Sequence, residues 1–430
     1  MNRPTSPPPR HPRGAPVAVT GTGVVSPIGK TLAEFDDALF AGRSAVRAQR
    51  LDLPGIDLPP VPVASADFDA GAEVAPSRVP LDRATAMALF AAREAARAAG
   101  LEPGRFDPER LGVFWGSGMA GAATFEATCR TVYADRRRMR PTSVVTTMPN
   151  APVAEIALLF GARGAALAYA CACASSAVAI GEAMRAIRAG WIDVAIAGGS
   201  EALLTPGVLA SWQAMRVLAP MGASAGDAAA VAASCRPFAA DRAGFALGEA
   251  AAAFVLESAD HARARGVAAF ATLAGYATNC DGVHITNPDA AGQVRAMSAA
   301  LADAGLAASD IGYVNAHGTA TTAGDAAEAE SVARVFGARG VPISSTKAIH
   351  GHLLGAGGAV ELLAALRALH HRRLPPTAHV READPSFAID LVTGVARESP
   401  TLAAVLSNSF AFGGTNAVLI ATRLPYGLSS

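Results

Sequence analysis

Cys171 and Cys173 lie one residue apart in ALAYACACASSAV, directly before a segment whose apolar residues have helical spacing. A thiol reacts as its thiolate, and the N-terminus of a helix favours that negative charge. The position therefore predicts that Cys173 is a nucleophile with a lowered pKa. A buried structural cysteine is the plainer alternative. A metal site at the C-x-C pair would need further ligands nearby in sequence, and none is present, so we expect no metal.

Two histidines occur among small residues after apolar runs. His317 lies in GYVNAHGTATTAGD, where Thr319 and Thr321 add hydroxyl groups that could contact a polar ligand. His352 lies in SSTKAIHGHLLGAGGAVE, between glycine-rich turns and five residues after Lys347. Loops at strand ends often hold functional groups on a rigid scaffold. Taken singly, each residue also fits a structural role.

The segment SNSFAFGGTNAVL, residues 407–419, places Phe410 and Phe412 beside a glycine pair. Gly413 and Gly414 permit unusual backbone dihedrals and close approach of the backbone. A backbone N–H at such a turn can donate to an oxyanion. A core hairpin with packed phenylalanines explains the same segment equally well.

Apolar, strand-like runs alternate with alanine-rich helical patterns, which is typical of an α/β fold with buried strands. The expected strands are Val17–Thr20, Val113–Trp115, Val194–Ala197, Ala251–Glu257, Ile311–Asn315 and Ala404–Leu406. One helix is expected to begin at a Ser175 or Ser176 cap and end near Gly190. A second, buried helix is expected over residues 358–371. We expect a disordered tail over residues 1–14 and two halves, residues 15–264 and 265–430.

The composition excludes several classes of protein. Apolar residues make up 51% of the 430 residues and charged residues 17%, so a large core is available. Lys plus Arg equals Asp plus Glu, 36 each, which argues against a general nucleic-acid surface. Five cysteines fit a reducing compartment better than a disulfide framework. No long apolar run suggests a membrane span, and the proline-rich start lacks the features of a secretory signal, so a cytoplasmic protein is expected.

From about Pro16 to the end, the chain resembles the elongating, type II β-ketoacyl-acyl carrier protein synthases of the thiolase-like superfamily. Four ordered motifs carry the resemblance: ACASSAV, NAHGTATTAGD, SSTKAIHGHLLGAGGAVE and NSFAFGGTN. Supporting stretches are VTGTGVVSPIG, GSGMAG, AGGSEA and FALGEAAAAFVLE. The resemblance implies two similar halves stacked as αβαβα layers. It also implies decarboxylative condensation of a malonyl thioester with an acyl group held on cysteine.

The resemblance also implies roles for particular residues. Cys173 corresponds to the acyl-accepting nucleophile, and His317 and His352 to the pair that binds the malonyl thioester carbonyl. Lys347 corresponds to a supporting residue, with Glu328 as its expected ion-pair partner. The backbone N–H groups of Cys173 and Phe412 correspond to an oxyanion hole, and Phe412 also to a gate. The residues expected to contact pantetheine or substrate are Thr319, Thr321, Met119 and Phe410.

Partners follow from the same resemblance. Acyl carrier proteins are acidic, and the run RRRMR offers a docking patch formed by Arg136, Arg137, Arg138 and Arg140. A solvated loop with incidental charge is the alternative. We expect a homodimer or a heterodimer with a related ketosynthase-like chain, and no cofactor beyond the phosphopantetheine that arrives on the carrier.

Two other functions stay open at this point. A cysteine hydrolase would also place a cysteine well before a histidine, although the sequence context of papain-like enzymes is absent. A non-catalytic scaffold or chain-length partner would usually lack the nucleophile, which is present here. Thr322, Gly357 and His350 depart from the pattern common in the family.

Overall fold

The computed structural model describes residues 16–423, except residues 54, 76, 78, 103 and 222–224. The tail expected over residues 1–14 lies outside this range. The strands are β1 Val17–Val25, β2 Arg47–Gln49, β3 Val61–Ala64, β4 Leu111–Gly116, β5 Ala166–Tyr169, β6 Val194–Glu201, β7 Leu247–Gly248, β8 Ala250–Ser258, β9 Ala271–Cys280, β10 Tyr313–Asn315, β11 Pro342–Ser344, β12 Arg373–Leu374, β13 Asp390–Leu391, β14 Arg397–Glu398, β15 Ala404–Phe410 and β16 Thr415–Thr422. Each of the six expected strands overlaps one of these.

Helices lie between many of the strands along the chain. They are α1 Leu32–Ala41, α2 Ala70–Glu73, α3 Arg83–Ala98, α4 Ala122–Tyr133, α5 Ser143–Thr147, α6 Ala151–Phe160, α7 Ser175–Arg188, α8 Pro206–Ala214, α9 Ala228–Ala232, α10 Ala259–Ala264, α11 Ala290–Ala304, α12 Thr322–Phe336, α13 Lys347–His350 and α14 Gly357–His371. None of the helices in the described part of the chain combines the length and apolarity needed to cross a bilayer.

The main sheet has the strand order β13-β11-β10-β15-β16-β9-β1-β8-β6-β4-β5. Outward from β1, the neighbouring pairs β1–β8 and β8–β6 are antiparallel, and the pairs β6–β4 and β4–β5 are parallel. Outward from β9, the pairs β9–β16 and β16–β15 are likewise antiparallel, and the pairs β15–β10 and β10–β11 are parallel. The two halves of the sheet therefore repeat one topology. They meet where Val17–Val19 of β1 pairs with Ala271–Leu273 of β9.

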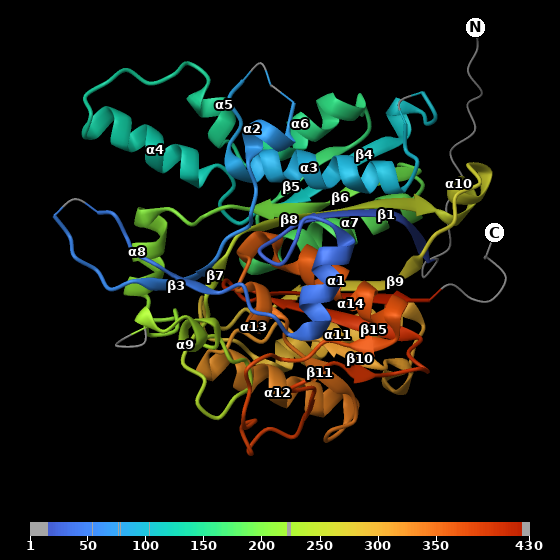
Figure 1. Cartoon of the computed structure of the whole chain (residues 1–430). Helices are drawn as coiled ribbons and strands as arrows, with labels where there is room; N and C mark the ends of the chain where they lie inside the picture. The colour runs from blue at the N-terminus through green and yellow to red at the C-terminus, as the bar shows by residue number, and fades with distance from the viewer. Residues whose placement is uncertain are drawn as a thin grey trace, which may run out of the picture.

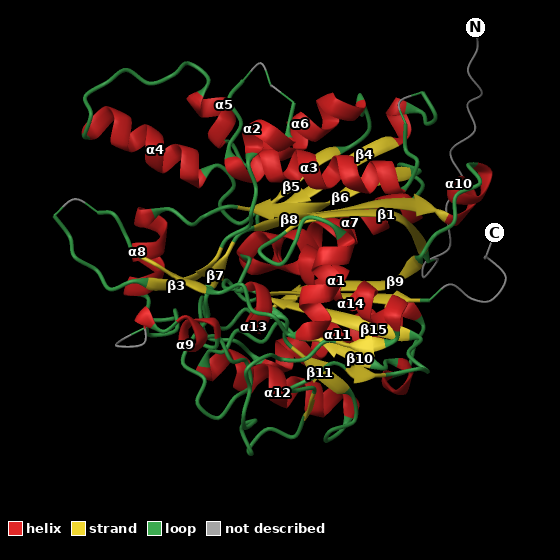
Figure 2. Ribbon diagram, in the orientation of Figure 1, coloured by secondary structure: helices red, strands yellow, loops and turns green. Residues whose placement is uncertain are grey.

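Helices and the two half-sheets form five layers, as expected (Figures 1 and 2). Helix α3 packs on β1 and β8 at one outer face, and α11 packs on β9 and β16 at the other. Helices α7 and α14 contact each other between the half-sheets, α7 on β4 and β6 and α14 on β15. The predicted boundary after residue 264 falls at the end of α10, just before β9, and stays a prediction.

The central layer positions the site because it holds the equivalent helices of the two halves. Strand β5 leads through a short turn into α7, and β11 leads through α13 and a second turn into α14. Helix α14 is buried along most of its length, as its all-round apolar sequence predicts. The segments before α7 and α14 hold Cys173 and His352, so the repeated topology brings these two residues to the same end of the central layer.

Candidate active site

Cys173 lies in a tight turn, the 3₁₀ segment Ala172–Ala174, between β5 and α7. Ala172 has a φ of 47°, an unusual value for a residue with a Cβ. The Ser175 hydroxyl accepts from the Cys171 N–H (2.9 Å) and donates to the Ala172 carbonyl (2.6 Å). Ala174, rather than a serine, is the N-cap residue of α7. The predicted serine cap is therefore wrong, because the hydroxyl closes the turn that presents Cys173.

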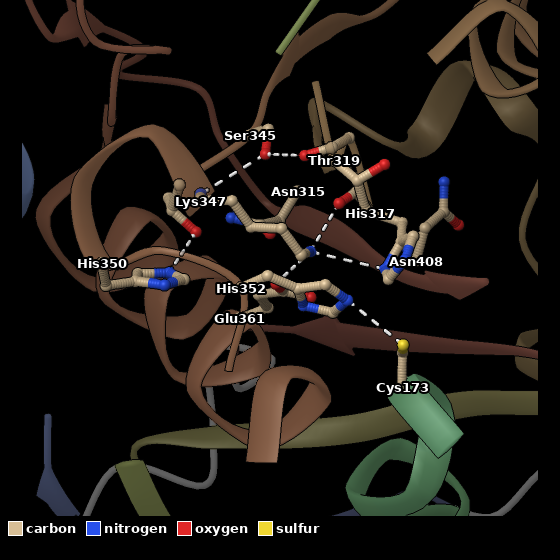
Figure 3. Close-up of polar contacts among 12 residues, drawn as sticks. Cys173, Asn315, His317, Thr319, Ser345, Lys347, His350, His352, Glu361 and Asn408 are labelled. Atoms are coloured by element: carbon tan, nitrogen blue, oxygen red, sulfur yellow. Dashed lines mark hydrogen bonds and ion pairs between the residues drawn. The ribbon is translucent and has the colours of Figure 1, made fainter. Parts of the chain in front are cut away.

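Cys173 is 7% exposed, and its sulfur lies 3.1 Å from Nε2 of His352 (Figure 3). Burial raises the pKa of the Cys173 thiol to about 12, although the charge of Lys347 and the backbone N–H of Phe412, which donates to the sulfur, both lower it. The expected lowering of this pKa at a helix N-terminus is therefore wrong. Desolvation of the thiolate outweighs the favourable charges, so the resting group is a thiol.

His352 is buried, and its hydrogen bonds fix its tautomer. Its Nδ1 atom accepts from the backbone N–H of Leu354 at 3.3 Å, so the ring proton lies on Nε2, which faces Cys173. Burial lowers the pKa of His352 well below 6.5, and the charge of Lys347 lowers it further. The ring is therefore a neutral N–H donor directed into the site.

His317 is arranged in the same way. Its ring centroid lies 5.5 Å from that of His352, with the rings at 83°. Its Nδ1 atom lies 3.4 Å from Nζ of Lys347, which also donates to the His317 carbonyl. An ammonium can only donate, so Nδ1 accepts and the proton of the neutral ring is on Nε2. Burial and the Lys347 charge lower the pKa of His317 well below 6.5.

Lys347 forms its ion pair with Glu361 of α14, and both side chains are buried (Figure 3). The expected pairing of Lys347 with Glu328 is therefore wrong. Two acidic residues approach the site, and the sequence does not reveal which of them lies beside the ammonium. Glu361 is the one acidic residue of α14 and lies in its buried, apolar part, where such a residue needs a partner. That signal could have identified it.

Glu328 and Asp325 instead hold the loop that carries His317. Glu328 accepts from the backbone N–H groups of His317 (2.9 Å) and Gly318 (2.6 Å). Asp325, one helical turn earlier on α12, accepts from those of Thr319 (2.9 Å) and Ala320 (3.0 Å). Burial raises the pKa of both carboxyls, that of Asp325 to about 7. Four successive amides are thus fixed by two side chains.

Glu201 was not predicted as a site residue. It is fully buried at the end of β6, and its carboxylate accepts from the backbone N–H groups of Gly118 (2.6 Å), Met119 (3.2 Å) and Gly355 (3.0 Å). Burial raises its pKa to about 7. It connects the loop after β4 to the loop that follows His352, so it contributes to placing that histidine.

A cavity of about 280 Å³ opens beside Cys173, His317 and His352. Among its lining residues are the predicted contact residues Thr319, Thr321 and Phe410, and the predicted oxyanion-hole and gate residue Phe412. Two groups of predicted residues do not line it. Met119 is 50% exposed on the loop after β4, and its expected contact with pantetheine or substrate stays a prediction. The exposed loop between α4 and α5 holds Arg136, Arg137, Arg138 and Arg140.

Ligand atoms of Cys173, His317 and His352 all lie within 4.8 Å of one another, close enough to surround a metal ion. A metal would bind the lone pair of each imidazole nitrogen that faces the cavity. In both rings that nitrogen carries the proton, because the other nitrogen accepts from Leu354 N–H or from Lys347. The hydrogen bonds therefore suit two donors to a substrate oxygen better than two metal ligands.

Comparisons with known proteins agree with this geometry. Residues 14–262 match the family model for the N-terminal domain of β-ketoacyl synthases, and residues 270–381 that for the C-terminal domain. Nodulation protein E of Rhizobium sp. (strain N33) is 42% identical over 79% of this chain and 82% of its own length. The 3-oxoacyl-[acyl-carrier-protein] synthase 2 of Vibrio cholerae is 35% identical, over 95% and 99% of the two chains. The solved structure of the ishigamide ketosynthase/chain length factor superposes with a TM-score of 0.85 and 31% identity, over 97% and 100%.

Proposed function

Because the chain belongs to the β-ketoacyl synthase family, we propose that it elongates acyl chains by decarboxylative condensation on an acyl carrier protein. One observation carries the proposal. The Cys173 thiol lies 3.1 Å from His352, and the ring of His317 lies 5.5 Å from that of His352, both rings being neutral donors. A sulfur acceptor for an acyl group beside two N–H donors is what this condensation needs.

In the first step Cys173 attacks the thioester carbon of the acyl carrier. The bond from that carbon to the carrier sulfur breaks, and the thiol proton passes to the departing carrier thiolate. The tetrahedral intermediate bears a negative oxygen. The N–H of Phe412, which donates to the sulfur in the resting structure, and that of Cys173 supply donors at this position.

In the second step a malonyl carrier binds with its thioester oxygen between Nε2–H of His317 and Nε2–H of His352. Loss of CO2 leaves an enolate, and two neutral N–H donors stabilise its developing charge. The enolate carbon attacks the Cys173 thioester. The carbon–sulfur bond breaks, the 3-oxoacyl carrier leaves, and the cysteine thiolate takes up a proton from water. Lys347 fixes the tautomer of His317 throughout and keeps both rings neutral.

The partners follow from the same proposal. The exposed arginines at residues 136–140 supply positive charge for an acidic carrier. Strand β5 is the edge strand of the sheet, and Leu167 on it is 46% exposed. Two large apolar residues of the preceding helix α6, Leu158 and Leu159, are exposed as well. We propose a second chain at this edge, either another copy or a related ketosynthase-like chain such as a chain length factor.

Neither a metal nor another cofactor takes part in the proposed reaction, since the carrier brings its own phosphopantetheine. We place the enzyme in the cytoplasm. All five cysteines are free thiols in the structure, which suits a reducing compartment.

The test separates the two half-reactions. Cys173→Gln should abolish condensation and labelling by chloroacetyl reagents but retain CO2 release from a malonyl carrier. His317→Ala and His352→Ala should each lower CO2 release by about a hundredfold or more, the effect of losing an oxyanion donor. Acylation of Cys173 should persist in His317→Ala, because its thiol is present. Loss of CO2 release in Cys173→Gln together with full CO2 release in both alanine variants would refute the assignment.

A further inference from the structure

A series of aromatic contacts among residues that line the cavity connects Phe412 to His352. The ring of Phe412 stacks on Trp212, with centroids 6.2 Å apart and planes at 25°. Trp212 meets Phe245 edge-on at 5.8 Å, and Phe245 meets His352 edge-on at 5.0 Å. His352 and the N–H of Phe412 both contact the sulfur of Cys173. The contacts thus form a closed circuit that includes the sulfur of Cys173 and in which Trp212 links Phe412 to Phe245.

The two neighbours of Trp212 are held very differently. Phe245 is 2% exposed, its N–H donates to Val217 O (3.0 Å), and its carbonyl accepts from the Ala219 N–H (2.9 Å). Phe412 is partly exposed and precedes Gly413 and Gly414, whose φ values are 87° and 78°. Backbone hydrogen bonds therefore hold Phe245 directly, whereas Phe412 precedes two glycines, whose backbone has the fewest steric restrictions.

The helix that carries Trp212 is anchored at its start. It lies near the end of α8, and the first turn of α8 is attached to α4 through Glu126. The carboxylate of Glu126 accepts from the Thr205 hydroxyl (2.5 Å) and from the Gly207 N–H (3.0 Å). An indole on an anchored helix, stacked on a phenylalanine that precedes two glycines, can determine where that phenylalanine rests.

We propose that Trp212 is a positioning residue that holds Phe412 closed, with its ring across the cavity mouth and its N–H on the Cys173 sulfur. The proposal rests on the function given above. An acyl or pantetheine chain that enters must move Phe412 off the indole. An aromatic pair of this geometry shifts an equilibrium by about two- to tenfold beyond simple burial. Trp212 therefore affects which acyl or pantetheine chains displace Phe412, and how often they do so.

Trp212→Leu and Trp212→Ala remove the stacking partner, whereas Trp212→Phe retains one. Trp191→Ala is the matched control, because Trp191 is 73% exposed and lies in the turn after α7. Three rates are measured in each variant: alkylation of Cys173 by iodoacetamide followed by peptide mapping, condensation, and CO2 release from a malonyl carrier. Variants are compared only where their melting temperatures show a folded protein.

The leucine and alanine variants should alkylate Cys173 about two- to tenfold faster and condense about tenfold more slowly, since the Phe412 N–H leaves the oxyanion position. Their CO2 release should change less than about twofold, because Phe245 still contacts His352. Trp212→Phe and Trp191→Ala should match the parent. An unchanged alkylation rate in the leucine variant, or a parallel fall of CO2 release and condensation, would overturn the proposal. If the parent itself fails to condense any acyl group, the proposed function fails, while the alkylation comparison still reports on the gate.

Discussion

Lys347 and Glu361 form an ion pair in which the two side chains are 0% and 1% exposed. The pair joins the segment before His352 to helix α14, and the same ammonium donates to the carbonyl of His317. One cation therefore connects the loops of both catalytic histidines. A charge buried this deeply is tolerated only while its counter-charge is present.

Glu361→Gln should lower the free energy of unfolding by about 3–5 kcal/mol, because it leaves the Lys347 ammonium buried without a counter-charge. The double variant Lys347→Met, Glu361→Leu should recover most of that loss, since it removes both charges and keeps the volume. Urea unfolding measures both values. The matched control is Glu330→Gln, whose side chain is 61% exposed beside Arg334, and it should change stability by less than about 1 kcal/mol. Equal stability of the single and double variants would contradict the expectation.

The low pKa values of the histidines predict the pH dependence of decarboxylation. Burial and the Lys347 charge depress the pKa of His317 and of His352, so both stay neutral below the ordinary value of about 6.5. The rate of CO2 release should therefore be flat from about pH 8 down to pH 6.5 and fall only in more acidic solution, where the rings become charged.

Removal of the Lys347 charge should shift this profile in a defined direction. In the Lys347→Met, Glu361→Leu variant the histidine pKa values should rise, because a neighbouring cation disfavours their protonated forms. Normalised profiles of CO2 release should then show the acid loss beginning at higher pH than in the parent. Superimposable acid limbs would show that the Lys347 charge has no effect on the two rings.

The arginines of residues 136–140 should act on the carrier rather than on the chemistry. Arg138→Glu combined with Arg140→Glu should raise KM for a malonyl carrier protein by about tenfold or more at low salt, with less effect as ionic strength increases. KM for a small malonyl thioester should not change. Arg105→Glu with Arg263→Glu, at positions 71% and 63% exposed, is the control. Equal effects on both substrates would reject docking at this loop.

The sequence by itself determined the chemical groups and the type of fold. The four motifs identified Cys173, His317, His352, Lys347 and Phe412, and the structure places all five at or directly beside one cavity. Alternating apolar runs predicted the α/β layers, because the local periodicity that buries a strand or helix is present in the chain itself.

Only the tertiary structure decided how those groups interact. The sequence offered Glu328 as the partner of Lys347, whereas packing of α14 places Glu361 there and leaves Glu328 to hold backbone amides. A lowered pKa at Cys173 was expected from the helix N-terminus, but enclosure by residues distant in sequence raises it. Ion-pair choice and desolvation depend on which distant atoms surround a group, and the spacing of residues along the chain does not specify that.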